Sequence, residues 1–378
     1  MKKMSKLLRI TFLLPGYPTI PIGGFRIVYQ YANQMVMRGH SVTIIHPLRI
    51  PLLEDKDELG KTEKSVLIKR AWRKIRNYRM YLSKPSPQLW QAVDPRVNMI
   101  YHPDLPSIQA FPDADVLIAT AAGTAPIVER APLSKGSKFY LIQHFESVMG
   151  NSEEAILKTW RGQMRKIVIS KWLKKLGEDN RISDISYVPN AIDHDIFNKR
   201  GKAASAEWPV SILSLWHNAA WKGARDALAA IQIVHAKYPE VKVSFFGTHK
   251  RPESLPEWIY YFHSPTQPEL VEIYNAHSIY LSASKSEGLG LTPIEAMACG
   301  SCFVGTAING FLDYAVNEKN ALLSPAENPL LLAENLTRVI ESPALRAQLS
   351  LQGYLDSQNF SWDHSAAAFE SILLQFSQ

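Results

Sequence analysis

The stretch SEGLGLTPIEAMACG, residues 286–300, is the most informative part of the sequence. Gly288 and Gly290 allow the backbone there to approach a ligand closely. The following residues predict the start of a helix, with Thr292 as the N-cap, a proline in the first helical position, and Glu295 completing a capping box. The N–H groups at such a helix start attract an anion, for example a diphosphate. The stretch therefore predicts a phosphate-binding loop that leads into a helix.

Two glutamates, Glu287 and Glu295, flank these glycines. Each has an ordinary explanation, Glu287 as a turn residue and Glu295 as a helix cap. A carboxylate beside a phosphate-binding helix start is nevertheless unfavourable unless it accepts hydrogen bonds from a polar ligand, such as the hydroxyls of a sugar. Capping and ligand binding by Glu295 are compatible, because a carboxylate has two oxygens.

Short apolar runs alternate with helical periodicity along the chain, and this pattern occurs twice. The alternation predicts an α/β fold with two doubly wound, Rossmann-like lobes. We expect a first lobe over residues 1–196, a linker over 197–209, a second lobe over 210–360, and a C-terminal helix within 361–378. The ligand site is expected at the carboxyl ends of strands, in a cleft between the lobes. The expected strands are residues 7–14, 42–45, 115–119, 139–142, 167–169, 210–215, 241–246, 278–282 and 302–305, and the expected helices are 25–38, 224–237, 270–275, 292–299, 329–341, 343–356 and 363–376.

The composition is that of a folded protein without a membrane span. Of the 378 residues, 46% are apolar and 20% are charged, which excludes wholesale disorder. No window reaches the roughly 18 apolar residues needed to span a bilayer, and the short apolar run at residues 10–14 predicts a strand in place of a signal peptide. The presence of only 2 cysteines argues against a secreted disulfide scaffold. We therefore expect a cytoplasmic protein.

The spacing of Glu287 and Glu295, followed by Ala-Met-Ala-Cys-Gly, resembles the hallmark of retaining glycosyltransferases of the GT-B fold, family 4. One such match is weak, but further stretches resemble the same family, in the same order, along nearly the whole chain. This resemblance implies two Rossmann-like lobes that face a central cleft, with the C-terminal helix crossing back to the first lobe. The further stretches are Gly23-Gly24 with Arg38-Gly39-His40, residues 167–171 (IVISK), residues 188–193 (VPNAID) and Lys222-Gly223.

The resemblance also implies roles for individual residues. Glu295 would hold the ribose of a nucleotide diphosphate sugar, Glu287 would hold the donor sugar, and Lys222 would stabilise the diphosphate as the glycosidic bond breaks. His144 would act near the reacting carbon of the sugar, by hydrogen bonding and charge stabilisation. No metal or other cofactor is implied. The donor would also contact the backbone of Gly288, Leu289, Gly290, Leu291 and Thr292, and a loop at the cleft would hold Gly23 and Gly24.

The sequence departs from the family at His217, where the family usually has an arginine five residues before the lysine. A histidine is largely neutral near pH 7 unless a phosphate raises its pKa. Three interpretations stay open: Arg225 substitutes for the arginine, His217 donates from a neutral ring, or His217 is a loop residue without a role.

Two short motifs resemble metal or redox sites but lack the usual context. Cys299-Gly-Ser-Cys302 lies where a helix is expected to end, whereas reactive cysteine pairs lie at helix N-termini. No second pair of ligands is present for zinc, so we expect two buried small residues. Asp193-His-Asp195 resembles the metal-binding motif of other transferases, but it lies in the connection between the lobes and is interpreted as a turn.

One segment accounts for the positive charge of the protein. The formal net charge is +7, and residues 61–84 hold nine basic residues and one acid. The segment predicts a basic amphipathic helix suited to anionic lipid headgroups, or else a surface helix that packs its apolar side on the first lobe. No nucleic-acid recognition motif accompanies it. Its apolar residues are Ile68, Trp72, Ile75, Tyr78 and Leu82, and the residues expected to dock on a membrane are Arg70, Trp72, Arg73, Lys74, Arg76 and Arg79.

Together these features predict a retaining glycosyltransferase that moves a sugar from a nucleotide diphosphate sugar to an acceptor hydroxyl. The expected acceptor is a membrane- or lipid-linked glycan in surface polysaccharide or glycolipid synthesis, with the enzyme on the inner face of the cell membrane. Two alternatives stay open: a sugar-nucleotide epimerase or phosphorylase of the same fold, and a catalytically degenerate membrane-binding protein. A dinucleotide oxidoreductase is disfavoured, because no G-x-G-x-x-G follows the first strand.

Overall fold

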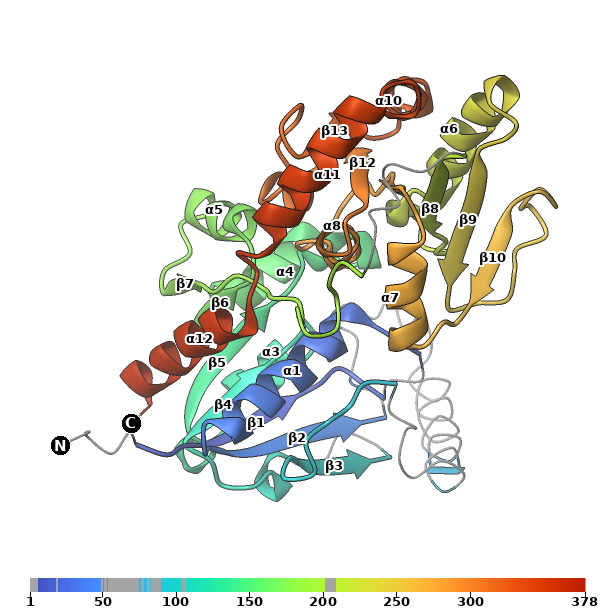
Figure 1. The fold of residues 1–378 in the computed structure, drawn as a ribbon. Helices are drawn as coiled ribbons and strands as arrows, with labels where there is room; N and C mark the ends of the chain where they lie inside the picture. The colour runs from blue at the N-terminus through green and yellow to red at the C-terminus, as the bar shows by residue number, and fades with distance from the viewer. Residues whose placement is uncertain are drawn as a thin grey trace. The chain divides into compact units, whose positions relative to one another are not determined.

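The computed structural model describes residues 6–17, 20–48, 50, 53, 75, 78, 79, 82, 90–103, 107–200 and 209–377. The chain divides into two compact units, Met1–Pro189 with Asp363–Gln378, and Asn190–Trp362. The division lies seven residues before the end expected for the first lobe, and most of the expected linker lies outside the described residues. Each unit is a parallel sheet with helices packed on it (Figure 1).

The described strands of the first unit form a seven-stranded sheet in the order β3-β2-β1-β4-β5-β6-β7. All of its pairs are parallel, so each connection must cross over the sheet. The chain builds from β1 to β3 in one direction and then from β4 to β7 in the other. The strands are β1 Arg9–Leu13, β2 Ser41–Pro47, β3 Asn98–His102, β4 Val116–Ala119, β5 Ser137–Ile142, β6 Arg165–Val168 and β7 Ile185–Tyr187, and the helices are α1 Gly23–Met37, α3 Ala125–Glu129, α4 Glu153–Trp160 and α5 Lys171–Asp179.

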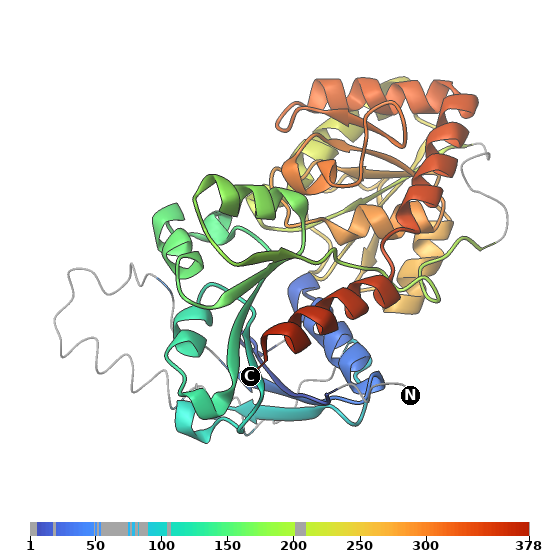
Figure 2. The ribbon, with the colours of Figure 1, turned by 90° about the vertical axis from the view of Figure 1, so that its left-hand side faces the viewer.

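Helices cover both faces of this sheet. α1 and the C-terminal helix α12 lie on one face, and α3, α4 and α5 lie on the other (Figure 2). The central strands are accordingly apolar throughout, and all four residues of β4 are buried. A strand buried on both faces has a continuous apolar run, which is why the sequence predicts the central strands well.

The C-terminal helix α12, Trp362–Phe376, packs in the first unit for all but its first residue. Phe369 of α12 stacks on Tyr31 of α1, with ring centroids 4.2 Å apart. Glu370 of α12 accepts a hydrogen bond from Nε2 of His40 at 2.9 Å. The last helix therefore returns to the first unit, as the sequence predicted.

The described strands of the second unit form a six-stranded sheet in the order β10-β9-β8-β11-β12-β13. Its pairs are also all parallel. Helix α6 packs against α10, and α8 packs against α11. The strands are β8 Ser211–Leu215, β9 Lys242–Gly247, β10 Tyr260–His263, β11 Ile279–Ser282, β12 Cys302–Thr306 and β13 Ala321–Ser324, and the helices are α6 Ala224–Lys237, α7 Gln267–Asn275, α8 Leu291–Ala298, α9 Asn309–Leu312, α10 Pro329–Glu341 and α11 Pro343–Ser357.

The strands and helices expected from the sequence are confirmed, with ends within three residues of the expected positions. The helices expected over 224–237 and 329–341 have those bounds in the structure. Strands β3, β7, β10 and β13 were not predicted. Across the described parts of the chain, no helix is both long enough and apolar enough to cross a bilayer.

Candidate functional site

The two neighbouring strands β8 and β11 define the point where the second sheet reverses its building direction. Ile212 of β8 is paired with Ile279 of β11, while β9 lies on the other side of β8. Ligands of open α/β sheets bind at the carboxyl ends of strands at such a switch point. The loops that follow β8 and β11 meet there, since the N–H of Lys285 donates to the carbonyl of Trp221 at 2.7 Å. Lys222 and Glu287 come from these two loops.

Gly223 brings the first loop into close contact with the second. Residues Ala220–Lys222 form a short 3₁₀ helix that ends at Gly223, whose φ of 63° lies in the left-handed region. A Cβ atom at this position would lie 1.8 Å from the carbonyl oxygen of Ala283, just after β11. Glycine is thus required for both conformation and space, and the contact positions Lys222 over the β11 loop.

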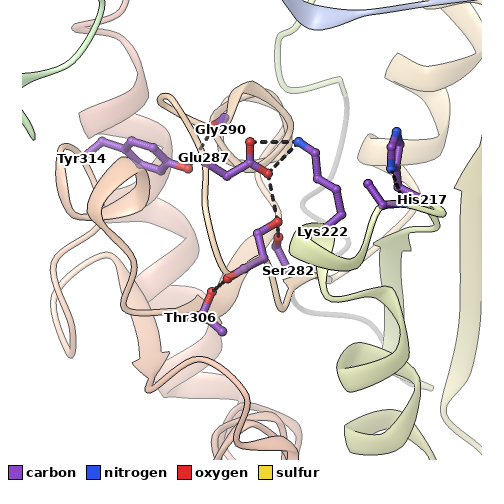
Figure 3. Close-up of polar contacts among 9 residues, drawn as sticks. His217, Lys222, Ser282, Glu287, Gly290, Thr306 and Tyr314 are labelled. Atoms are coloured by element: carbon purple, nitrogen blue, oxygen red, sulfur yellow. Dashed lines mark hydrogen bonds and ion pairs between the residues drawn. The ribbon is translucent and has the colours of Figure 1, made fainter. Parts of the chain in front are cut away.

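Lys222 and Glu287 form an ion pair in this site (Figure 3). The Lys222 ammonium donates to both oxygens of the Glu287 carboxylate, at 2.8 Å to Oε1 and 2.9 Å to Oε2. The hydroxyl of Ser284 donates to the same Oε1 at 2.9 Å, and Thr306 in turn donates to the carbonyl of Ser284. The structure thus brings together two residues predicted as catalytic. Ser284 was missed, and its position three residues before Glu287 was the available signal.

The start of helix α8 differs from the prediction. The helix begins at Leu291 with Gly290 as its N-cap, and no side chain caps it. Thr292 is therefore already inside the helix, and the predicted capping box of Thr292 and Glu295 is wrong. Gly290 has a φ of 83°, and a Cβ there would lie 2.4 Å from the Phe311 ring, so this glycine sets where the helix begins.

The corrected helix start still suits an anion. The first turn of α8 lacks a side-chain cap, and it follows the loop of Gly288, Leu289 and Gly290 directly. Its backbone N–H groups and the helix dipole favour a negative ligand group at this end. Tyr314 anchors this loop, because its hydroxyl donates a hydrogen bond to the carbonyl of Gly290 at 3.1 Å (Figure 3).

Glu295 lies in the interior of the second unit. Its side chain has no exposed surface, and its Oε2 accepts a hydrogen bond from the Tyr274 hydroxyl of α7 at 3.2 Å. Since Glu295 is not a helix cap, that ordinary explanation for the residue is removed. A ligand hydroxyl would reach this carboxylate only after neighbouring protein atoms move.

His217 is held as a neutral ring in the loop after β8. The backbone N–H of Ala219 donates to its Nδ1 at 3.0 Å, so the ring proton is on Nε2. Burial lowers the pKa of His217 below its ordinary value, and the positive charges of Lys222 and His249 lower this pKa further. Arg225 is exposed in the first turn of α6. The geometry thus supports His217 as a neutral Nε2–H donor, the second interpretation left open by the sequence.

The first unit holds the other predicted residues at the carboxyl edge of its own sheet. Gly23 and Gly24 are the first residues of α1, which begins two residues before the helix expected over 25–38, and the Gln143 amide donates to the carbonyl of Gly24 at 3.1 Å. His144 follows β5 and donates from Nδ1 to the carbonyl of Phe145 at 2.8 Å. A Cβ at Gly24 would lie at ordinary contact distance from Gln143, so space alone does not require this glycine.

Glu146, two residues after His144, is a further titratable group at this edge. Its Oε1 accepts a hydrogen bond from the N–H of Ala122, just after β4, at 2.8 Å. Burial raises the pKa of Glu146 to about 7, although the bond from Ala122 acts in the opposite direction. This carboxyl is therefore part-protonated near neutral pH.

The two misleading motifs are resolved as expected. Cys299 and Cys302 are free and buried, and burial raises the pKa of each thiol to about 12, so neither is a reactive thiolate. Asp193-His-Asp195 lies in a turn, where the N–H of Asp195 donates to the Asp193 carboxylate at 3.1 Å.

Most of the basic segment, residues 61–84, lies outside the described residues. Four of its residues are described, and all four are helical and exposed. The apolar ones, Ile75, Tyr78 and Leu82, are 49%, 55% and 61% exposed; the fourth is Arg79. The predicted membrane-docking residues outside the described part are Arg70, Trp72, Arg73, Lys74 and Arg76.

Comparisons with known proteins show similarity to glycosyltransferases. Residues 195–356 match a protein family described as glycosyl transferases group 1. A D-inositol 3-phosphate glycosyltransferase from Streptomyces bingchenggensis is 36% identical over 108 residues, which are 28% of this chain and 24% of that protein. An uncharacterized glycosyltransferase from Methanocaldococcus jannaschii is 28% identical over 109 residues, covering 29% of this chain and 31% of that one. The chain thus aligns with about a quarter to a third of the length of these relatives.

Solved structures resemble the chain over nearly its whole length. HepE from Anabaena, in complex with UDP and glucose, has a TM-score of 0.72 at 14% identity and covers 97% of this chain and 100% of its own. Sucrose-phosphate synthase from Thermosynechococcus elongatus has a TM-score of 0.69 at 15% identity and covers 97% of this chain and 98% of its own. The fold is therefore GT-B, and the half of the chain that carries Lys222 and Glu287 is similar to the group 1 glycosyl transferases.

Proposed function

We propose that this protein is a retaining glycosyltransferase of family 4, which moves a sugar from a nucleotide diphosphate sugar to an acceptor hydroxyl. The observation that carries the proposal is the meeting of Lys222 and Glu287 at the switch point of the second sheet, beside the uncapped start of α8. This arrangement offers a cation and a helix start to a diphosphate, and a carboxylate to sugar hydroxyls. The match of residues 195–356 to the group 1 family supports the same activity.

In the proposed reaction, the bond between the anomeric carbon and the phosphate oxygen breaks as negative charge develops on the diphosphate. Lys222 and the start of α8 stabilise that charge, and His217 donates a hydrogen bond from Nε2. A new bond forms between the anomeric carbon and the acceptor oxygen on the same face. The acceptor proton goes to the leaving phosphate oxygen. The proposal requires no metal ion, because these groups supply the positive charge.

In this proposal His144 acts near the reacting carbon of the sugar, and Gly23 and Gly24, at the start of α1, lie on the acceptor-side lobe. His144 is oriented by its bond to the Phe145 carbonyl, and the start of α1 is held to the same edge by the bond from Gln143 to Gly24. Parallel sheets place the ends of β1, β4 and β5 along one edge, so these groups lie where a ligand of the first unit would bind.

We further propose that the acceptor is a membrane- or lipid-linked glycan, reached by docking of residues 61–84 on an anionic membrane. The exposed apolar residues Ile75, Tyr78 and Leu82 support this proposal, because their spacing places them on one helix face. Sedimentation with phosphatidylglycerol-containing liposomes tests it. Neutralising Arg70, Arg73 and Arg76 should abolish sedimentation, whereas neutralising the exposed Lys158, Arg161 and Lys175 should not.

A thermal-shift screen of nucleotide sugars tests the proposed activity. A donor at about 100 times its dissociation constant stabilises the unit that binds it by about 2.7 kcal/mol. The selected donor is then incubated with candidate acceptors, and the anomeric configuration of the product is read by NMR. Release of nucleoside diphosphate that requires an acceptor supports a transferase, and isomerisation of the sugar without an acceptor indicates an epimerase. Formation of a sugar phosphate from an oligosaccharide and inorganic phosphate, with no nucleotide consumed, indicates a phosphorylase. Absence of any nucleotide binding would indicate the catalytically degenerate alternative.

Glu295→Gln tests the predicted ribose contact. The amide oxygen retains the hydrogen bond from Tyr274, so the fold should persist. Loss of the charged acceptor should weaken binding of the donor by about tenfold, which corresponds to about 1.4 kcal/mol. Unchanged donor affinity, measured by titration calorimetry, would remove Glu295 from the site.

A further inference from the structure

Lys222 and Glu287, the two side chains that the proposed donor would contact, are bound to each other in an ion pair. Both Glu287 oxygens accept from the Lys222 ammonium, and Ser284 also donates to Oε1 (Figure 3). The two side chains are only 24% and 12% exposed. In the structure the Lys222 ammonium is thus paired with a carboxylate.

The fold holds both backbones of this pair in place. On the Lys222 side, Gly223 packs against the carbonyl of Ala283. On the Glu287 side, a Cβ added to Gly310 would lie 2.7 Å from the Glu287 carbonyl oxygen and 2.9 Å from its Cβ. Both segments are closely packed at these glycines, so we expect the pair to separate by rotation of its side chains. The pair is therefore part-buried and fixed by the packing of both backbones, unlike an exposed surface salt bridge.

A ligand with a diphosphate and no sugar gains little binding free energy from contacts with Lys222 and Glu287. Its phosphate oxygens must compete with the Glu287 carboxylate for the Lys222 ammonium, and the displaced carboxylate stays close to them as a like charge. A ligand that also carries a sugar supplies hydroxyl donors, which replace the hydrogen bonds that Glu287 loses. The presence or absence of the sugar thus decides whether opening of the pair is compensated.

We propose that the Lys222–Glu287 pair discriminates against the spent nucleoside diphosphate in favour of the intact nucleotide sugar. This inference rests on the proposed function and adds a specificity-determining role for Glu287. The carboxylate acts as the repulsive element of the site, and such elements commonly produce specificity. The consequence for turnover is that transfer of the sugar restores the ion pair and expels the diphosphate product.

The experiment compares UDP with UDP-glucose, the nucleotides seen in HepE structures, by titration calorimetry on the whole 378-residue chain. GDP with GDP-mannose and ADP with ADP-glucose are titrated in the same way. In Glu287→Gln the amide has the size of the carboxylate but no charge. The ratio of the dissociation constants of the nucleoside diphosphate and its nucleotide sugar should fall at least about tenfold, or about 1.4 kcal/mol. This fall should come from tighter binding of the nucleoside diphosphate.

Glu327→Gln is the matched control. It removes a carboxylate from Lys285, which follows Ser284 in the same loop, and Glu327 is 70% exposed. Its ratio should stay within about twofold of the unaltered protein, since exposed pairs contribute little. Glu287→Ala is a second variant in case the amide does not fold, and it should shift the ratio in the same direction. Product inhibition by the nucleoside diphosphate should strengthen in both Glu287 variants.

Two outcomes are distinguishable. If the unaltered protein binds none of the six nucleotides, the proposed function fails and this inference fails with it. If the unaltered protein binds a nucleotide pair but both Glu287 variants lose affinity equally for both members, the proposed function survives and the inference is overturned. A structural role for Glu287 alone predicts that second result.

Discussion

Glu146→Gln should make the protein more stable at pH 8 and leave its stability almost unchanged at pH 5. The Glu146 carboxyl accepts a hydrogen bond from the Ala122 N–H, and a glutamine oxygen can accept the same bond. Burial raises the pKa of this carboxyl to about 7 in the folded protein, against 4.5 for the ordinary group. The variant removes only the ionisation and retains the hydrogen-bond acceptor.

The sign follows from the proton affinities of the two states. Between pH 4.5 and 7 the unfolded chain is ionised at Glu146 while the folded chain retains the proton, so stability falls as the pH rises through this window. Below pH 4.5 Glu146 is protonated in both the folded and the unfolded state, so stability does not change with pH there. Above pH 7 the full decrease in stability has been reached. A shift of this size corresponds to at most about 3 kcal/mol, and we expect about 1 to 3 kcal/mol because the residue retains some exposure. The glutamine variant should recover this amount at pH 8.

Thermal unfolding followed by circular dichroism at pH 5 and pH 8 measures the effect. The midpoint of the first unit should rise by between about 2 and 10 °C at pH 8, and by less than about 3 °C at pH 5. The control is Glu178→Gln on α5, an exposed acid that should show no such difference between the two pH values. A variant that is equally or less stable than the unaltered protein at pH 8 would refute the assigned burial of this carboxyl.

Three further predictions concern the second unit. Lys222→Ala should abolish turnover, because the diphosphate loses its stabilising cation. The protein should stay folded, because Ser284 still donates a hydrogen bond to Glu287. Steady-state kinetics and circular dichroism measure the two effects, and residual turnover above about 1% would contradict the charge-stabilising role. At pH 8, His217→Gln should bind the donor with the same affinity as the unaltered protein. At pH 6 only the unaltered protein should bind more tightly, because a bound phosphate favours the protonated form of His217, whose pKa is otherwise lowered by burial. Calorimetry at both pH values tests this. Gly223→Ala should lower the unfolding midpoint by clearly more than Gly150→Ala, because the former places a Cβ 1.8 Å from a carbonyl oxygen while Gly150, with a φ of 95°, has nothing within 4 Å; equal losses would mean that the contact does not matter.

The sequence predicts the central strands of both sheets and misses the four strands at the sheet edges. β4 and β5 have continuous apolar runs because helices cover both of their faces. β3, β7 and β10 lie at edges, and their residues are exposed or half-buried. β13 is a further missed edge strand, and it is mostly buried but only four residues long. Such strands exist because a neighbouring strand offers hydrogen bonds, which is a property of the assembled sheet.

The start of α8 shows how local chemistry can mislead. Thr292 and Glu295 have the spacing of a capping box, yet the structure forms its capping box at Thr266 and Glu269, at the start of α7. The deciding contact for α8 is between Gly290 and the ring of Phe311, which is distant in sequence. No pattern within the first turn of α8 reports that contact.

The functional site was predictable as a set of residues but not as an arrangement. Lys222 and Glu287 are 65 residues apart, and they meet because β8 and β11 are neighbours in the sheet. The family resemblance predicted that both residues bind one ligand, but it did not predict that they bind each other without it. Ser284 shares the Glu287 carboxylate, and no resemblance had pointed to it.

The charges of the second unit indicate that, in the proposed donor site, a ligand replaces the contacts that Lys222 and Glu287 make with each other. His217 is neutral, and the charge of Lys222 is balanced by Glu287, so these residues present little standing positive charge to an approaching diphosphate. Affinity must then come from contacts made as the ion pair opens, with the start of α8 as the group already free of a side-chain cap. Short-range contacts of this kind are screened by salt much less than long-range attraction between exposed charges. A site built in this way distinguishes ligands by whether they satisfy both members of the pair, and it does so more by how slowly they leave than by how fast they arrive.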